Sequence, residues 1–373
     1  MEKDTYKSET LRDSEKEQRL KYKGSKDWFF CPEQMITEQI GDLEKRLRKV
    51  EMSAFGIDVF TDSERLCEQI RQFNNFNASG SNSNSKKRLF YVTDKSNMPP
   101  LPNPSGGIGL VEMSAEPADV LCDPSSGLYV INCWDRFTSM ESLVLGMHSY
   151  DNLRNGKLGM HAALIEKDGY GYVLIGKPKT GKTTISLSLA AEGFHLISDD
   201  WVEVEEREGQ FYASGINPSI SLDQQTLSQL QSKYGQYKDI EQSGFSSYGK
   251  NIMPIKVVND AWNPEHDIPV RKTFILDNDC DEFESIDSDY FLDLLKTTDP
   301  HTPFMNVPEQ SGVRSINGIS DDIRIGIEDI DELRRLRGQL AEDFVMSTSQ
   351  ELRKFRNKDH SLDDALTIIR NQI

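Results

Sequence analysis

The feature that most constrains the fold of this chain is a phosphate-loop pattern set between an apolar run and a helical run. Residues 176–183, GKPKTGKT, satisfy G-x-x-x-x-G-K-[ST]. In this pattern the glycines let backbone N–H groups curl around phosphates, the lysine reaches the β- and γ-phosphate oxygens, and the threonine hydroxyl ligates Mg²⁺. Segment 172–175 is predicted to be a strand and residues 183–192 a helix whose N-terminus attracts anions. This context predicts an α/β fold with a nucleoside triphosphate site.

We expect the loop and the threonine that follows it to hold the nucleotide. The predicted binding residues are Gly176, Lys177, Pro178, Lys179, Thr180, Gly181, Lys182, Thr183 and Thr184. Lys182 is also a candidate catalytic residue, because its ammonium can offset the negative charge that develops during phosphoryl transfer. Thr183 is a candidate metal ligand. The predicted cofactors are ATP and Mg²⁺.

Two further features supply candidate catalytic groups. Asp199 and Asp200 follow a short apolar run, 16 residues after Thr183. One carboxylate can hold Mg²⁺ while the other accepts a proton from an attacking hydroxyl, or a single aspartate binds the metal and its neighbour lies on the surface. Spacing leaves both arrangements open, because neighbours in a regular strand face opposite sides. His161 opens a predicted strand, where a histidine can be structural or catalytic.

Charge and composition exclude several classes of protein. The 43 lysine and arginine residues face 61 aspartate and glutamate residues, a formal net charge of −18. Binding to nucleic acid depends on lysine and arginine at the phosphates, so we expect none. No apolar run approaches the ~20 residues of a membrane span, and the N-terminus has no signal-peptide core. The five cysteines lack zinc-ligand or disulfide-framework spacing. We therefore expect a cytoplasmic protein without a membrane partner.

The composition changes along the chain divide it into five regions. We predict a charged disordered tail, an amphipathic helix, a mainly β N-terminal part of the main domain, a P-loop core with a substrate-side region, and a helical tail. Their respective bounds are 1–30, 31–51, 52–158, 159–345 and 346–373. In the second region Ile36, Ile40, Leu43, Leu47 and Val50 form a two-heptad stripe. The stripe packs on its own domain or forms a short coiled coil in a homo-oligomer.

Residues 160–204 resemble the catalytic core of the HPr kinase/phosphorylase family. In that family a strand-opening histidine precedes a glycine-ending turn, a strand with a P-loop, a helix closed by a glycine-containing segment, and an Asp-Asp pair. The corresponding positions are His161, Gly169, Gly176 to Thr183, Glu192 to His195, and Asp199-Asp200. The resemblance implies a mixed central sheet with flanking helices, similar to the C-terminal part of phosphoenolpyruvate carboxykinase. It also implies phosphoryl transfer from ATP to a hydroxyl, typically of a serine.

Carried over position by position, the resemblance implies a role for each candidate. Asp199 would be the catalytic base, Asp200 would support Mg²⁺ with Thr183, and His161 would assist the base. Segment 214–220, SGINPSI, lies where substrate-side residues are expected. Lys250 can correspond to a lysine of the related kinases or be an ordinary loop residue.

The sequence as a whole predicts an ATP- and Mg²⁺-dependent kinase. Its acceptor would carry a hydroxyl, as a protein or peptide serine or as a small alcohol. The downstream Glu-Ile-Arg-Gly-Leu-Gly type of signature of true HPr kinase/phosphorylases has no clear copy, which favours an acceptor other than HPr. Two alternatives are a carboxykinase-like enzyme and a non-enzymatic, oligomerising nucleotide sensor.

Overall fold

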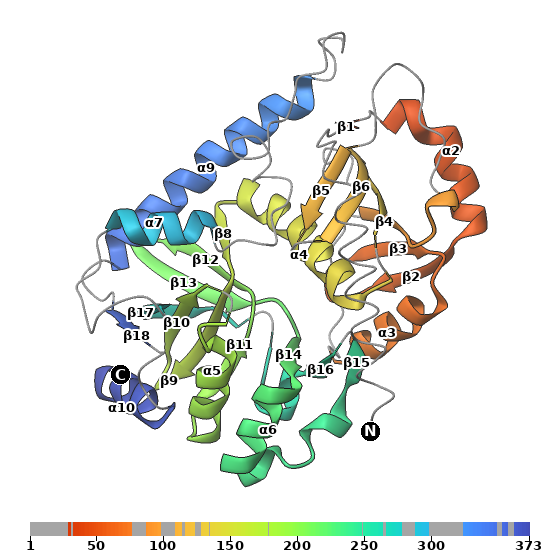
Figure 1. The fold of residues 1–373 in the computed structure, drawn as a ribbon. Coiled ribbons are helices and arrows are strands. Elements are labelled where there is room, and N and C mark those ends of the chain that lie inside the picture. The colour runs from red at the N-terminus through yellow and green to blue at the C-terminus, as the bar shows by residue number, and fades with distance from the viewer. Residues whose placement is uncertain are drawn as a thin grey trace.

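Two large β-sheets, one from each half of the chain, organise the fold, and a small third sheet lies near the second (Figure 1). The computed structural model describes residues 29–30, 33–76, 87–97, 109–113, 116–123, 128–133, 135–177, 179–247, 249–263, 266–277, 288–297, 324–348, 353–356 and 362–373. The predicted disordered tail, residues 1–30, lies outside the described residues apart from its last two. None of the described helices combines the length and apolarity that a bilayer crossing requires.

The first sheet belongs to the N-terminal half of the chain. Its described strands are β1 (Phe29–Phe30), β2 (Arg48–Met52), β3 (Ile57–Thr61), β4 (Lys87–Val92), β5 (Gly109–Met113), β6 (Glu116–Asp123) and β7 (Leu128–Asn132). They are ordered β1-β6-β7-β4-β3-β2, with β5 beside β6. The central strands β3, β4 and β7 are parallel, so their carboxyl ends lie at one edge.

The N-terminal half also contains helices. The helices are α2 (Glu33–Arg46), α3 (Glu64–Asn74), the 3₁₀ turn η1 (Lys95–Asn97) and α4 (Phe137–Arg154). Because α3 and α4 fall within residues 52–158, that region is α/β rather than mainly β as predicted. The N-cap of α3 is Ser63, whose hydroxyl accepts from the N–H of Leu66. Helix α4 is buried on several sides. Its apolar residues are therefore not confined to one face, and the amphipathic pattern by which a surface helix is predicted is missing.

Helix α2 is shorter than the predicted helix 31–51. It ends at Arg46 because the next residues pair as β2 with β3. The stripe residues Ile40, Leu43 and Leu47 are buried against side chains of the first sheet, including Phe60. These three residues of the stripe are thus covered within the chain, as in the first of the two predicted arrangements.

The second sheet is mixed and belongs to the C-terminal half. Its strands are β8 (Lys157–Met160), β9 (Ala162–Lys167), β10 (Tyr170–Gly176), β11 (His195–Ser198), β12 (Val202–Arg207), β13 (Gln210–Gly215), β17 (Ile268–Asp277) and β18 (Arg353–Arg356). The order is β11-β9-β10-β17-β13-β12-β8, with β18 beside β17. Strand β10 is parallel to β17 and antiparallel to β9. A mixed sheet of this kind was predicted.

Both faces of the second sheet are covered by helices. These are α5 (Lys182–Ala191) and α10 (Leu362–Gln372) on one side, and α7 (Ser288–Thr297) and α9 (Arg324–Thr348) on the other (Figure 1). Along β10 the buried side chains alternate. Tyr172 and Leu174 join the cluster that contains Ile185 of α5, whereas Val173 and Ile175 join the opposite cluster. Burial on both faces explains the continuous apolar run that precedes the P-loop.

The remaining elements lie between β13 and β17 in the chain. They are β14 (Ser219–Asp223), α6 (Gln224–Lys233), the 3₁₀ turns η2 (Gly235–Tyr237), η3 (Ile240–Ser243) and η4 (Ile255–Val257), β15 (Phe245–Ser247) and β16 (Lys250–Pro254). Strand β18 lies inside the predicted helical tail 346–373, where it pairs with β17. The two halves share a core, because Trp201 and Ile252 pack in one cluster with Phe73 and Phe137.

Candidate phosphoryl-transfer site

The P-loop joins β10 to α5, in the strand-loop-helix arrangement that the sequence predicts. Gly176 ends the strand, and a Cβ there would lie 2.5 Å from both the carbonyl of Leu276 and the hydroxyl of Thr180. Gly181 precedes the helix with a φ of +93°. Glycine is required at both positions, the first for close approach and the second for left-handed backbone. Pro178 of the predicted binding set lies outside the described residues.

Lys182 is the first residue of α5 and is buried. Its Nζ donates to the carbonyl of Gly176 at 2.7 Å and lies 3.4 Å from that of Lys177. Burial lowers the pKa of the ammonium, while the negative charges of Asp200 and Asp199 oppose that effect. The P-loop lysine is therefore held at the loop, close enough to both aspartates for their charges to act on it.

Asp199 follows β11 and is almost fully buried, with 2% of its surface exposed. Its Oδ2 accepts from the hydroxyl of Thr183 at 3.3 Å, and its Oδ1 from that of Ser186 at 3.4 Å. Burial and the neighbouring charge of Asp200 raise the pKa of Asp199 to about 7. These are few and long hydrogen bonds for a buried carboxylate, so its charged form is poorly compensated.

Asp200 is more exposed and pairs with His161. The His161 Nε2 atom lies 2.6 Å from Asp200 Oδ1. The pairing follows from topology: β9 is antiparallel to β11, so the residue just before β9 lies near the residues just after β11. His161 was predicted to assist Asp199, but the contact that the structure shows is with Asp200. The two aspartates therefore have different surroundings: Asp199 is buried beside Thr183, and Asp200 is more exposed beside His161.

The donors around Thr183 fit a magnesium ion. No cluster of three His, Cys, Asp or Glu side chains with metal-binding geometry occurs in the part of the chain that the structure describes. P-loop enzymes do not need one, because a threonine hydroxyl and one carboxylate act together with phosphate and water oxygens. Here the carboxylate beside the Thr183 hydroxyl is Asp199, whereas the predicted metal partner was Asp200. A cation there would also favour the ionised form of Asp199.

A second group of polar side chains lies near the aspartates: Asn217 and Ser219 belong to the predicted substrate-side segment 214–220, whereas Glu141 was not predicted as part of the site. Glu141 of α4 is buried, and its carboxylate contacts Ser219 and Asn217. Burial raises its pKa to about 7, and the charge of Asp200 adds to that effect while that of Lys250 opposes it. The sequence signal is faint: Glu141 is the one acidic residue in the otherwise apolar or neutral run 137–147.

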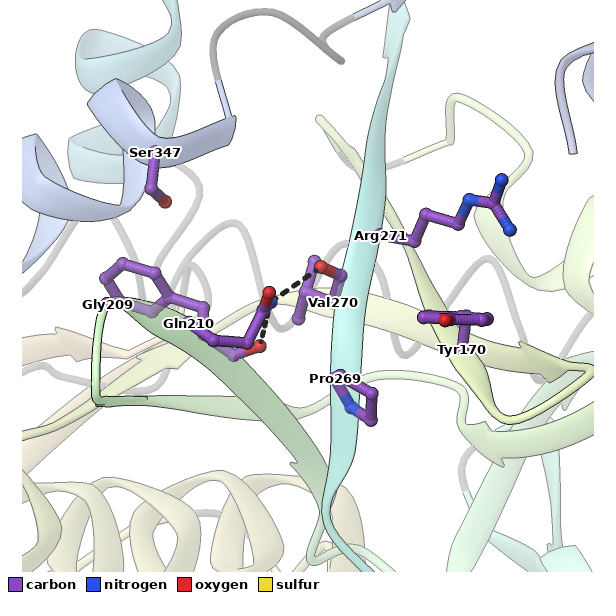
Figure 2. Close-up of a pocket in the computed structure, with 8 residues that line it drawn as sticks. Tyr170, Gly209, Gln210, Pro269, Val270, Arg271 and Ser347 are labelled. Atoms are coloured by element: carbon purple, nitrogen blue, oxygen red, sulfur yellow. Dashed lines mark hydrogen bonds between the residues drawn. The ribbon is translucent and has the colours of Figure 1, made fainter.

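A cavity of about 360 Å³ lies elsewhere and is not part of this site (Figure 2). It is lined by residues that include Tyr170, Gln210 and Arg271. Tyr170 begins β10 and the P-loop begins at its end, so the two places are about 20 Å apart along the strand. The Arg271 guanidinium lies over the Tyr170 ring, 5.0 Å from its centroid. Candidate chemistry is therefore concentrated at the P-loop end of the sheet.

Comparison with known proteins found two curated relatives. Two curated proteins named HPr kinase/phosphorylase, from two strains of Treponema pallidum, are each 30% identical to the chain over 101 residues. The resemblance to the HPr kinase/phosphorylase family is confirmed. The match covers 27% of this chain, which spans about a third (31%) of the curated relatives' length.

The HPr-kinase-like similarity is thus partial. A solved structure titled HPr(Ser) kinase/phosphatase, from Coxiella burnetii, is 18% identical with a TM-score of 0.20, over 31% of this chain and 63% of that one. No family model matches the sequence. The fold stands, from its own strand order, as a mixed α/β architecture.

Proposed function

We propose that the protein is an ATP- and Mg²⁺-dependent kinase that transfers the γ-phosphate to a hydroxyl group. The observation that carries the proposal is the convergence of Lys182, Thr183, Asp199, Asp200 and His161 at one end of the second sheet. The similarity to HPr kinase/phosphorylases supports a kinase-type enzyme. The likeness to the C-terminal part of phosphoenolpyruvate carboxykinase stays a prediction.

The contacts favour a division of labour between the two aspartates. Asp199 and Thr183 would hold Mg²⁺, which when bound would supply positive charge to offset that of the phosphates. Asp200 would accept the proton of the attacking hydroxyl, and His161 would hold that carboxylate in place through its Nε2–Oδ1 contact. Lys182 would stabilise the charge that develops on the transferred group. This exchanges the roles that family resemblance alone implies for the aspartates.

The acceptor in this proposal is a serine of a protein or peptide, or a small alcohol. Incubation with γ-labelled ATP and cell lysate, followed by separation of proteins from small molecules, should show label in one of the two fractions. Lys182→Ala should reduce labelling about 10³-fold, because a charge-stabilising group is lost in a buried site. Lys238→Ala, at an exposed lysine of the same half, should label like the wild type.

Three results, from this experiment or from separate assays of ATP binding and oxaloacetate decarboxylation, would contradict the proposal. Equal labelling by the Lys182→Ala variant would exclude the P-loop as the phosphate site. Tight ATP binding without label transfer would favour the nucleotide sensor. Decarboxylation of oxaloacetate with a nucleoside triphosphate would favour the carboxykinase-like enzyme.

A further inference from the structure

A buried carboxylate from the first half of the chain reaches the proposed site. Glu141 lies on α4 and only 6% of its surface is exposed. Its Oε1 lies 2.9 Å from the hydroxyl of Ser219 and 3.4 Å from the Nδ2 of Asn217. The Asn217 side chain in turn accepts from the backbone N–H of Ser219 at 3.1 Å. Glu141 thus closes a small hydrogen-bonded group on the turn 217–219.

That turn is tied closely to the strand that carries the two aspartates. Gly215, at the end of β13, packs so tightly on β11 that a Cβ would lie 2.4 Å from the carbonyl of Ile197 and 2.8 Å from the Cβ of Ser198. Asp199 and Asp200 are the next two residues of that chain segment. A shift of the turn would therefore reach the aspartates through Gly215 and its close packing on Ile197 and Ser198, the residues that precede them.

Keeping the Glu141 carboxylate ionised in its buried position costs free energy. The charged groups that act on it are Asp200, which repels it, and Lys250, which attracts it. Burying a carboxylate costs several kcal/mol unless its partners compensate, and its two hydrogen-bond partners are neutral. Raised pKa values and costly burial beside a candidate catalytic pair are typical of functional positions.

We infer that Glu141 is a positioning residue of the proposed phosphoryl-transfer site, holding the 217–219 turn against the strand end that bears Asp199 and Asp200. The inference rests on the proposed kinase function. It gives the N-terminal half of the chain a part in the reaction, because α4 packs in the core that also contains Phe73 and Trp201.

The test compares Glu141 with a matched buried carboxylate that contacts the same helix. Glu203 of β12 is 2% exposed and accepts from the Nδ2 of Asn152 on α4 at 2.7 and 2.8 Å. We expect Glu141→Ala to lower the rate of label transfer from γ-labelled ATP about tenfold or more, with half-saturating ATP changed less than twofold. Glu203→Ala should lower the melting temperature but leave the transfer rate of the folded protein unchanged.

Two further variants keep the test decisive if an alanine variant does not fold. Glu141→Gln keeps an oxygen that accepts from Ser219, so it should restore most of the transfer rate. Ser219→Ala removes the same contact from the other side and should reproduce the loss. Wild-type transfer by Glu141→Ala, an equal loss in Glu203→Ala, or a Glu141→Gln variant as slow as Glu141→Ala would each overturn the inference.

The inference and the proposed function can fail separately. If the wild-type protein transfers no label to any lysate fraction, the kinase proposal fails and the role of Glu141 in it fails too. If the wild type transfers label and Lys182→Ala does not, while Glu141→Ala is unaffected, only the assignment of Glu141 is wrong.

Discussion

In each large sheet one strand is followed by a carboxylate that is at least partly buried, Asp62 in the first and Asp199 in the second, and the two differ in how far their surroundings stabilise the charged form. In the first sheet, Asp62 follows β3 and accepts four hydrogen bonds, from the N–H and hydroxyl of Thr93, the N–H of Asp94 and the amide of Asn97. Burial alone would raise the pKa of Asp62, but these bonds together hold it below its ordinary value. The charged carboxylate is stable there without any ligand.

Near the end of β11 in the second sheet, the carboxylates have too few hydrogen bonds to stabilise their charged forms. Asp199 has two long hydroxyl contacts and Glu141 has two neutral partners, and the pKa of each is raised to about 7. Like charges add to the cost, since Asp200 acts on both. The charged form of Asp62 is therefore stabilised by the fold itself. The charged forms of Asp199 and Glu141 are not, and a bound cation or substrate would stabilise them.

The largest expected effect separates the two aspartates of the second sheet. Asp200→Asn should lower kcat for label transfer about 10²- to 10⁴-fold with ATP affinity retained, because it removes the proposed base. Asp199→Asn should instead raise the Mg²⁺ concentration needed for half-maximal transfer. Titrations of Mg²⁺ and ATP on both variants check this. The opposite pattern would return the roles to those implied by family resemblance.

The next effect is on stability and depends on pH. The folded-state pKa of Glu141 is about 7 against an ordinary 4.5, so the folded protein binds the extra proton and wild-type stability falls as pH rises through that window. Glu141→Gln cannot ionise. Relative to wild type it should gain up to about 3 kcal/mol between pH 4.5 and pH 8. Urea unfolding at the two pH values measures this, and a pH-independent difference would contradict it.

A smaller stability effect is expected at the first sheet. Asp62→Asn replaces a charged acceptor of four hydrogen bonds and should destabilise the protein by about 2 kcal/mol at pH 7, measured by urea unfolding. Label transfer per folded molecule should not change. Since the pKa of Asp62 is lowered in the folded state, its contribution should be lost as pH falls through that lowered value. A loss of label transfer per folded molecule in this variant would contradict the claim that Asp62 contributes only to stability.

The smallest expected effect concerns His161. His161→Ala removes the partner of Asp200 but leaves its carboxylate, so we expect about a tenfold loss in kcat with ATP affinity unchanged. His148→Ala is the control, because His148 lies near the buried Glu203, outside the P-loop region. Equal losses in the two variants would mean that both histidines act only through stability.

The sequence alone determined the P-loop and its flanking strand and helix. These depend on neighbouring residues: an apolar run, glycines where close approach or a positive φ is needed, and a lysine and threonine at the start of a helix. The Asp-Asp pair and His161 could also be named, because the pair follows one short predicted strand and His161 opens another. These sequence patterns can be recognised without knowing which strands pair in the sheet.

Tertiary structure alone decided which partner each candidate meets. The Thr183–Asp199 and His161–Asp200 contacts follow from the order β11-β9-β10, which no local pattern specifies. Glu141 is brought to the site by α4, whose burial on several sides hides its helical period, and its neighbours Asn217 and Ser219 lie more than 70 residues away in the chain. Its raised pKa exists only because the fold removes water and places Asp200 nearby.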